Sequence, residues 1–164
     1  MNEIIHNTLE VVEVGDEMID RLKVLASASP RKRARLCLHR SPTDATHEML
    51  IAFHRDSFMP PHRHPANKSE SYHVIGGMMV VHLFDDTGAA VRSISLGSSA
   101  PSFLYRLSTN LWHMPTAASE WLIYHEVYSG PFLKDRDVEF PSWAPAESDH
   151  AEVARFRSRL PNPL

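Results

Sequence analysis

The sequence lacks the features that mark several common classes of protein. It holds one cysteine, Cys37, in 164 residues, so no internal disulfide can form and a reducing compartment is compatible. No apolar run approaches the roughly 20 residues of a membrane helix, and the acidic N-terminus does not resemble a signal peptide. A formal net charge of -3 argues against binding nucleic acid by phosphate neutralisation. We therefore expect a cytoplasmic protein with neither a membrane nor a nucleic acid as partner.

The middle of the chain has the pattern of short β-strands, and helices are expected only near its ends. Apolar residues at helical spacing predict a helix over 16–26 and another over 148–160. Alternating or apolar segments between turn residues predict strands at 33–39, 48–54, 71–84, 89–96, 103–107, 111–115 and 120–128. Short strands at regular spacing predict a mainly β sandwich or closed barrel.

The chain is long enough for one domain with a full core, in which we distinguish three parts. They are an N-terminal helical extension (1–30), the β-barrel (31–130) and a C-terminal segment (131–164). The last part contains the aromatic and proline-rich run FPSWAP and a helix with Val153, Phe156 and Leu160 on one face. Because an apolar helical stripe needs a partner surface, we expect this segment to pack on the barrel.

Two histidines and a glutamate lie close together in PPHRHPANKSESYHVIGG, residues 60–77. Side chains alternate along an extended chain, so His62 and His64 face the same side, and the neighbouring prolines favour that extended geometry. Glu70 follows a short polar loop and begins the next strand. Imidazoles and a carboxylate converging from adjacent strands would hold a metal with open coordination positions. Solvated histidines in a proline-rich loop are the alternative.

A later histidine, His113 in LWHMP, lies inside an apolar strand pattern. Together with H-x-H, the glutamate six residues later and a following glycine, it resembles the two-part signature of the cupins. Cupins are double-sheet jelly rolls, so the resemblance implies a single double-stranded β-helix barrel with flanking helices. It also implies one bound divalent metal, for which iron, zinc, manganese, nickel and copper are all suitable. The implied ligands are His62, His64, Glu70 and His113.

One position of this motif differs from the usual cupin pattern. Cupins normally have a proline-x-glycine turn before the second-motif histidine, whereas this chain reads STNLWH from Ser108 to His113. Asparagine tolerates the left-handed backbone conformation better than most residues. We therefore expect Asn110 to replace the glycine.

A narrower resemblance extends over nearly the whole chain. The segments SPRKRARLCLHR, EMLIAF, PHRH, LFDDTG, LWH, HEVYSGPF and FPSWAP are similar to those of the WbuC family of cupin-fold metalloproteins. That family is found in clusters that build O-antigen and other surface polysaccharides. The resemblance implies a metal-binding cupin that acts on or binds a saccharide intermediate of this biosynthesis. Sugar isomerisation or epimerisation is the leading chemistry. The alternatives are an iron-dependent dioxygenase and a non-catalytic, metal-anchored binding or regulatory module.

Three polar residues of the strand at 33–39 share one face, opposite Leu36 and Leu38. We expect this face to lie on the inner or mouth-facing side of the barrel and to bind an anionic small molecule, because arginine forks match carboxylate and phosphate groups. A solvated edge strand is the alternative. The candidate ligand-binding residues are Arg33, Arg35 and His39.

A homodimer is compatible with the sequence.

Glu126, Tyr72 and His39 are the candidates for a catalytic role. Tyr72 shares the inward parity of Glu70. Glu126 could be a general base beside the metal or could pair with an arginine of the first strand, and we favour the ion pair. Alternation along 120–128 does not say which face looks inward.

Overall fold

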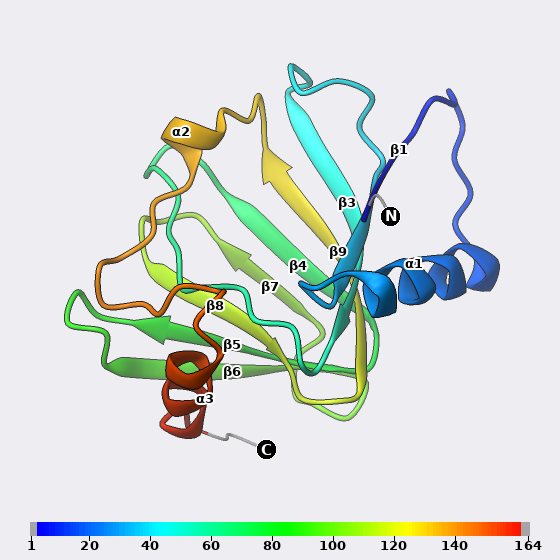
Figure 1. Ribbon diagram of the computed structural model, residues 1–164. Coiled ribbons are helices and arrows are strands. Elements are labelled where there is room, and N and C mark those ends of the chain that lie inside the picture. Colours follow the sequence, from blue (N-terminus) through cyan, green and yellow to red (C-terminus); the bar gives the residue numbers. More distant parts are fainter. Residues whose placement is uncertain (1–2, 162–164) are drawn as a thin grey trace.

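The computed structural model describes residues 3–161, which form two β-sheets that pack face to face with helices around them (Figure 1). The elements in chain order are β1 (Ile4–His6), α1 (Asp16–Ala28), β2 (Arg33–Cys37), β3 (Thr46–His54), β4 (Glu70–Gly76), β5 (Met78–Phe84), β6 (Ala90–Gly97), β7 (Leu104–Leu107), β8 (Trp112–Ala117), β9 (Trp121–Ser129), α2 (Lys134–Asp137) and α3 (His150–Ser158). The mainly β architecture predicted from the sequence is confirmed. No helix within 3–161 has the length and apolarity needed to cross a membrane.

The larger sheet has the strand order β1-β2-β3-β9-β4-β7, and the smaller has β6-β5-β8. β1 runs parallel to β2, and the other paired strands are antiparallel. β1 was not expected from the sequence, because only three residues pair with a strand about 30 positions away. The β5–β6 hairpin turns at Gly88, whose φ of 87° is the positive value that its turn sequence predicts.

The register of the larger sheet aligns inward-facing side chains in rows across the strands. Cys37 pairs with Met49, Met49 with Glu126, and Glu126 with Tyr72, so one row crosses β2, β3, β9 and β4. Cys37, Met49 and Tyr72 belong to the buried core between the sheets, together with Val81 and other apolar residues of β5 and β6. This row therefore lies on the inner face.

The opposite face of β2 and β3 is covered by α1, which lies across it in Figure 1. Leu22 and Ala26 of the helix are fully buried against Ala34, Leu36 and Leu50. Helix packing on this side places the alternate residues of β2 on the inner face of the sheet.

The C-terminal segment packs on the barrel through a separate apolar cluster. Val153 of α3 and the half-buried Phe156 and Leu160 join Phe84 and Trp112, so the apolar stripe of the helix has the partner surface that it needs. Trp143 stacks on Phe156 with 6.2 Å between ring centroids. The side chain of Asp149 caps α3 by accepting from the Glu152 amide at 3.0 Å.

Candidate functional site

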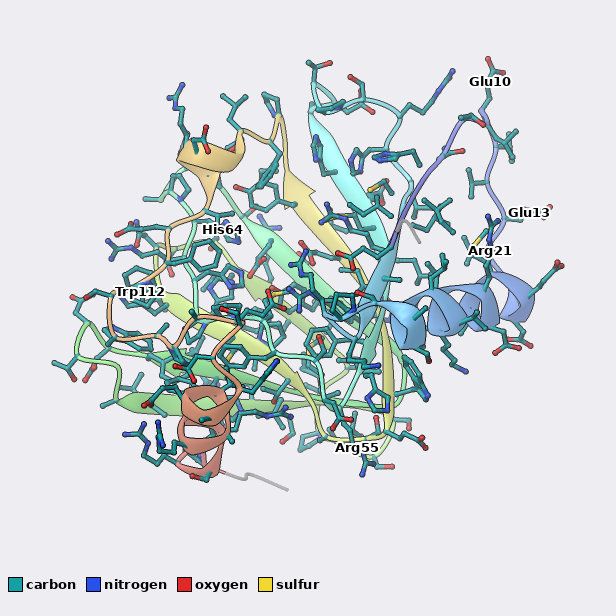
Figure 2. All side chains as sticks on the ribbon, in the orientation of Figure 1. Glu10, Glu13, Arg21, Arg55, His64 and Trp112 are labelled. Carbon is teal, nitrogen blue, oxygen red and sulfur yellow. The ribbon has the colours of Figure 1, made fainter. Side chains whose placement is uncertain are left out.

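Four residues from three separate segments meet inside the barrel. His62 and His64 lie on the chain before β4, Glu70 is the first residue of β4, and His113 is the second residue of β8. The backbones of His62 and His113 exchange hydrogen bonds of 3.0 Å and 2.8 Å, which holds the two segments side by side. Figure 2 shows His64 within the molecule below α2, whereas Glu10, Glu13 and Arg21 lie on the outside.

The ligand atoms of this group all lie within 4.8 Å of one another, and all four residues are buried. His113 Nε2 lies 2.6 Å from Glu70 Oε1, and His64 Nε2 lies 3.2 Å from Glu70 Oε2. Two of the nitrogens and one oxygen have no hydrogen-bond partner within the described residues: His64 Nε2, His113 Nε2 and Glu70 Oε1. Buried polar atoms without partners are rare in proteins, and a cation between them would satisfy all three.

The second nitrogen of each imidazole faces a backbone carbonyl. His62 Nδ1 lies 3.0 Å from the Pro60 oxygen, His64 Nδ1 lies 2.6 Å from the Asp137 oxygen, and His113 Nδ1 lies 2.9 Å from the Leu111 oxygen. A carbonyl can only accept, so each Nδ1 carries the proton and each Nε2 has a free lone pair. Metal-bound histidines are oriented in this way. The residues present therefore fit a divalent metal ion.

The charge states of His62 and Glu70 also suit a metal. Burial, together with the nearby His113, lowers the pKa of His62 to about 3, so this imidazole is neutral at neutral pH. Burial alone would raise the pKa of Glu70, but His113 and His64 hold it well below its usual range. Neutral imidazole and ionised carboxylate are the forms that coordinate metals.

The turn before His113 differs from the expectation. Lys32 is the only non-glycine residue with a positive φ in the described part of the chain, so Asn110 does not take the left-handed conformation. The start of β8 is held instead by Trp112, whose Nε1 donates to Asp86 Oδ1 at 2.9 Å. The guanidinium of Arg63 lies over the face of the indole ring, 4.1 Å from its centroid.

A cavity of about 420 Å³ lies beside the histidines and reaches across the inner face of the larger sheet. Its size is within the range of sites for small molecules. His62 and His64 line it, and Met49, Ile51 and Met59 give it an apolar wall. The three candidate ligand-binding residues of the first strand, Arg33, Arg35 and His39, also line it.

These three residues have different surroundings. Arg33 is buried and bonded to Glu147, whereas Arg35 is exposed to the cavity and takes part in no ion pair within residues 3–161. His39 stacks on His47 with 4.0 Å between ring centroids, and its Nδ1 lies against the backbone of Glu48. His47, whose pKa is lowered by burial, was not singled out by the sequence.

Glu126 lines the same cavity, which settles the face of β9 that alternation left open. The ion pair with an arginine that the sequence favoured is absent, because no salt bridge or side-chain hydrogen bond of the described residues includes Glu126. Burial, together with the charge of Glu70, raises the pKa of the Glu126 carboxyl to about 7, against an opposing effect of Arg35. Glu126 is therefore an unpaired acid group that can both give and take a proton near neutral pH.

Tyr72 is fully buried, and its hydroxyl donates to Glu70 Oε2 at 3.0 Å. The shared inward parity of Tyr72 and Glu70 is thus observed. The hydroxyl orients a candidate metal ligand.

A model of the family described as a domain of unknown function, DUF6016, matches residues 14–96 of this chain. The chain belongs to the DUF6016 family. None of the curated proteins compared with it is a match.

Solved structures show what fold this DUF6016 chain has. An L-ribose isomerase of Geodermatophilus obscurus is similar over 78% of this chain and 91% of that one, with 15% identity and a TM-score of 0.54. An L-ribose isomerase of Cellulomonas parahominis with L-ribose is similar over 71% and 72%, with 18% identity and a TM-score of 0.53. A Klebsiella pneumoniae protein with a double-stranded β-helix domain is similar over 69% and 82%, with 13% identity and a TM-score of 0.52. At these identities the likeness shows the fold alone, and it confirms the predicted double-stranded β-helix.

Proposed function

We propose that this chain is a metal-dependent enzyme that moves a proton on a small anionic sugar, as an isomerase or epimerase does. The observation that carries the proposal is Glu126, an unpaired carboxyl in the cavity. In the sheet register Glu126 lies opposite Tyr72, two positions along β4 from Glu70. A proton-transfer group therefore lies next to the candidate metal ligands.

The acid–base properties of Glu126 suit this reaction. A general base is most effective when its pKa is near the working pH, and the pKa of Glu126 is about 7. The ionised carboxylate would take a proton from a carbon next to a carbonyl of the sugar. In an isomerisation the resulting acid would return that proton to the neighbouring carbon, while the proton of the substrate hydroxyl moves to the former carbonyl oxygen. In an epimerisation a second acid on the opposite side of the sugar would protonate the same carbon.

The other parts of the site would bind and orient the sugar. A divalent ion held by the four buried residues would polarise a carbonyl or hydroxyl oxygen as a Lewis acid. Arg35 would hold the anionic group of the ligand, since its guanidinium faces the cavity without an ion pair inside residues 3–161. Met49, Ile51 and Met59 would keep water from the reacting carbons.

The similar structures support a sugar as ligand. Two structures of the Cellulomonas parahominis L-ribose isomerase are with L-ribose and with L-psicose. Resemblance to the WbuC family favours a saccharide intermediate of surface-polysaccharide biosynthesis as the substrate. The single cysteine is compatible with the reducing cytoplasm as the place of the reaction.

Solvent deuterium exchange tests the proposed proton transfer. The protein, loaded in turn with manganese, iron or zinc, is incubated in D₂O with uronates and other sugar acids and followed by proton NMR. We expect deuterium to enter the position next to the carbonyl of one substrate. Glu126→Gln should abolish the exchange and retain the metal. Glu48→Gln, on the opposite face of the neighbouring strand, is the matched control and should exchange as the wild type does. Saturable binding without any exchange would instead indicate a non-catalytic binding module.

A further inference from the structure

Arg33 and Arg35 lie two residues apart on β2 and both line the cavity, but only Arg33 is neutralised. The guanidinium of Arg33 donates from Nη1 to Glu147 Oε1 at 2.7 Å and from Nη2 to Glu147 Oε2 at 3.2 Å. Nη1 also donates to the Phe58 carbonyl at 2.9 Å and to Ser57 Oγ at 3.1 Å. This fork is therefore already filled by a carboxylate of the chain itself.

Glu147 reaches the cavity from the C-terminal segment, 114 positions along the chain from Arg33. Its carboxylate also lies 3.5 Å from Nε of Arg31, which in turn pairs with Glu3 at 3.1 Å. Two cations and two anions thus balance at this end of the cavity. Arg35 has no carboxylate partner of this kind in the described residues, so beside Arg33 it is the cation that remains for a ligand. Arg40 also lines the cavity without an ion pair in these residues, but it lies five positions farther along the chain, beyond the end of β2.

The spacing of the two arginines decides what kind of anion fits. Residues two apart on a strand are separated by roughly 7 Å, so a group bound at Arg35 also lies close to the Arg33–Glu147 pair. A single negative charge is satisfied by Arg35. A second negative charge would find no free cation at Arg33, because the carboxylate of Glu147 already occupies that guanidinium.

We infer that Glu147 determines the specificity of the site by occupying Arg33 and leaving a subsite for one negative charge. The preferred ligand is then a sugar acid with a carboxylate, and a sugar phosphate carrying two charges is rejected. This inference rests on the proposed function, in which Arg35 binds the anionic group of the sugar.

Calorimetric titration of the metal-loaded protein with glucuronate and glucose 6-phosphate tests this inference. The wild type should bind glucuronate more tightly. Glu147→Gln keeps the shape of the side chain but frees the fork of Arg33, so the affinity for glucose 6-phosphate should rise at least tenfold and exceed that for glucuronate. The metal is common to all variants and cancels in the ratio of the two affinities.

Arg33→Met is the matched control, because it breaks the same ion pair without freeing a cation. Its affinity for glucose 6-phosphate should not rise. An equal rise in Arg33→Met and Glu147→Gln would mean that loosening the C-terminal segment opens the cavity, and it would overturn the inference. No rise in Glu147→Gln, with folding verified by its melting curve, would also overturn it. Glu147→Ala repeats the test with a smaller side chain.

Arg35→Ala separates this inference from the proposed function. Loss of glucuronate binding in Arg35→Ala, together with unchanged selectivity in Glu147→Gln, would leave the proposed anion site standing and remove the role of Glu147. Unchanged glucuronate binding in Arg35→Ala would overturn the proposed anion site and, with it, the subsite for one charge that the inference places at Arg35. A wild type that binds neither sugar would overturn both.

Discussion

The hydroxyl of Tyr72 donates to Oε2 of Glu70 at 3.0 Å, while Oε1 of the same carboxylate lies 2.6 Å from His113 Nε2. One oxygen of Glu70 is thus held by Tyr72 and also lies 3.2 Å from His64 Nε2, and the other oxygen is directed at His113. The carboxylate is oriented before any ion arrives, which reduces the cost of binding a metal.

Tyr72→Phe should therefore weaken metal binding by about 10–100-fold, the usual effect of removing a hydrogen bond to a metal ligand. Competition with a chelator of known affinity measures the change. Tyr105→Phe is the matched control, because Tyr105 packs on Tyr72 with 5.7 Å between ring centroids and its hydroxyl has no partner in residues 3–161. Equal affinities in the two variants would show that the Tyr72 hydroxyl does not orient the ligand.

Trp143→Ala should lower the free energy of unfolding by about 2–4 kcal/mol, because the indole is half-buried against Phe84, Trp112 and Phe156. Denaturant titration of the two proteins gives the difference. Phe140→Ala removes an aromatic ring from the same segment, but that ring is 58% exposed, so a loss below about 0.5 kcal/mol is expected. Similar losses in both variants would contradict a fixed C-terminal segment.

The titration of His82 should account for part of the pH dependence of the free energy of unfolding. It is buried, with Nδ1 2.9 Å from Ser93 Oγ and Nε2 3.3 Å from Thr116 Oγ1, and burial lowers its pKa to about 4. Well above about pH 6.5 the imidazole is neutral in both the folded and the unfolded chain, so it does not lower the free energy of unfolding. As the pH falls from about 6.5 to 4, only the unfolded chain binds the proton. The free energy of unfolding therefore decreases by on the order of 2 kcal/mol.

The pH dependence can be assigned to His82 by comparison with His82→Gln, which does not titrate. The free energy of unfolding, measured by denaturant titration between about pH 7 and 4, should fall more steeply in the wild type. Parallel curves for the two proteins would show that His82 does not carry this effect.

Local patterns in the sequence account for much of the fold and of the candidate metal centre. The alternation of β2 separated a polar face with Arg33 and Arg35 from an apolar face with Leu36, and α1 packs on the apolar face. The H-x-H spacing brings His62 and His64 together without any distant contact. The inward orientation of Glu126 was harder to predict, because both faces of β9 carry a mixture of polar and apolar residues. Only the register with Tyr72 places Glu126 on the inner face.

Residues whose role depends on a distant contact were missed. Glu147 and Asp137 lie in a polar tail with no periodic pattern, and their partners are 114 and 73 positions away. Asn110 was wrongly expected to have a left-handed conformation, because it was assumed to replace the glycine of the usual cupin turn. The side chain of Trp112, bonded to the neighbouring hairpin, makes that turn unnecessary.

The central claim is that four buried residues from three segments hold one divalent metal. Elemental analysis of the purified protein, beside His64→Ala and His113→Ala, tests it most directly. His73→Ala, which removes an exposed imidazole from β4, is the control. We expect about one metal per chain in the wild type and the control, and strong depletion in the other two variants with the barrel still folded. Full metal content in either of those variants would contradict the claim.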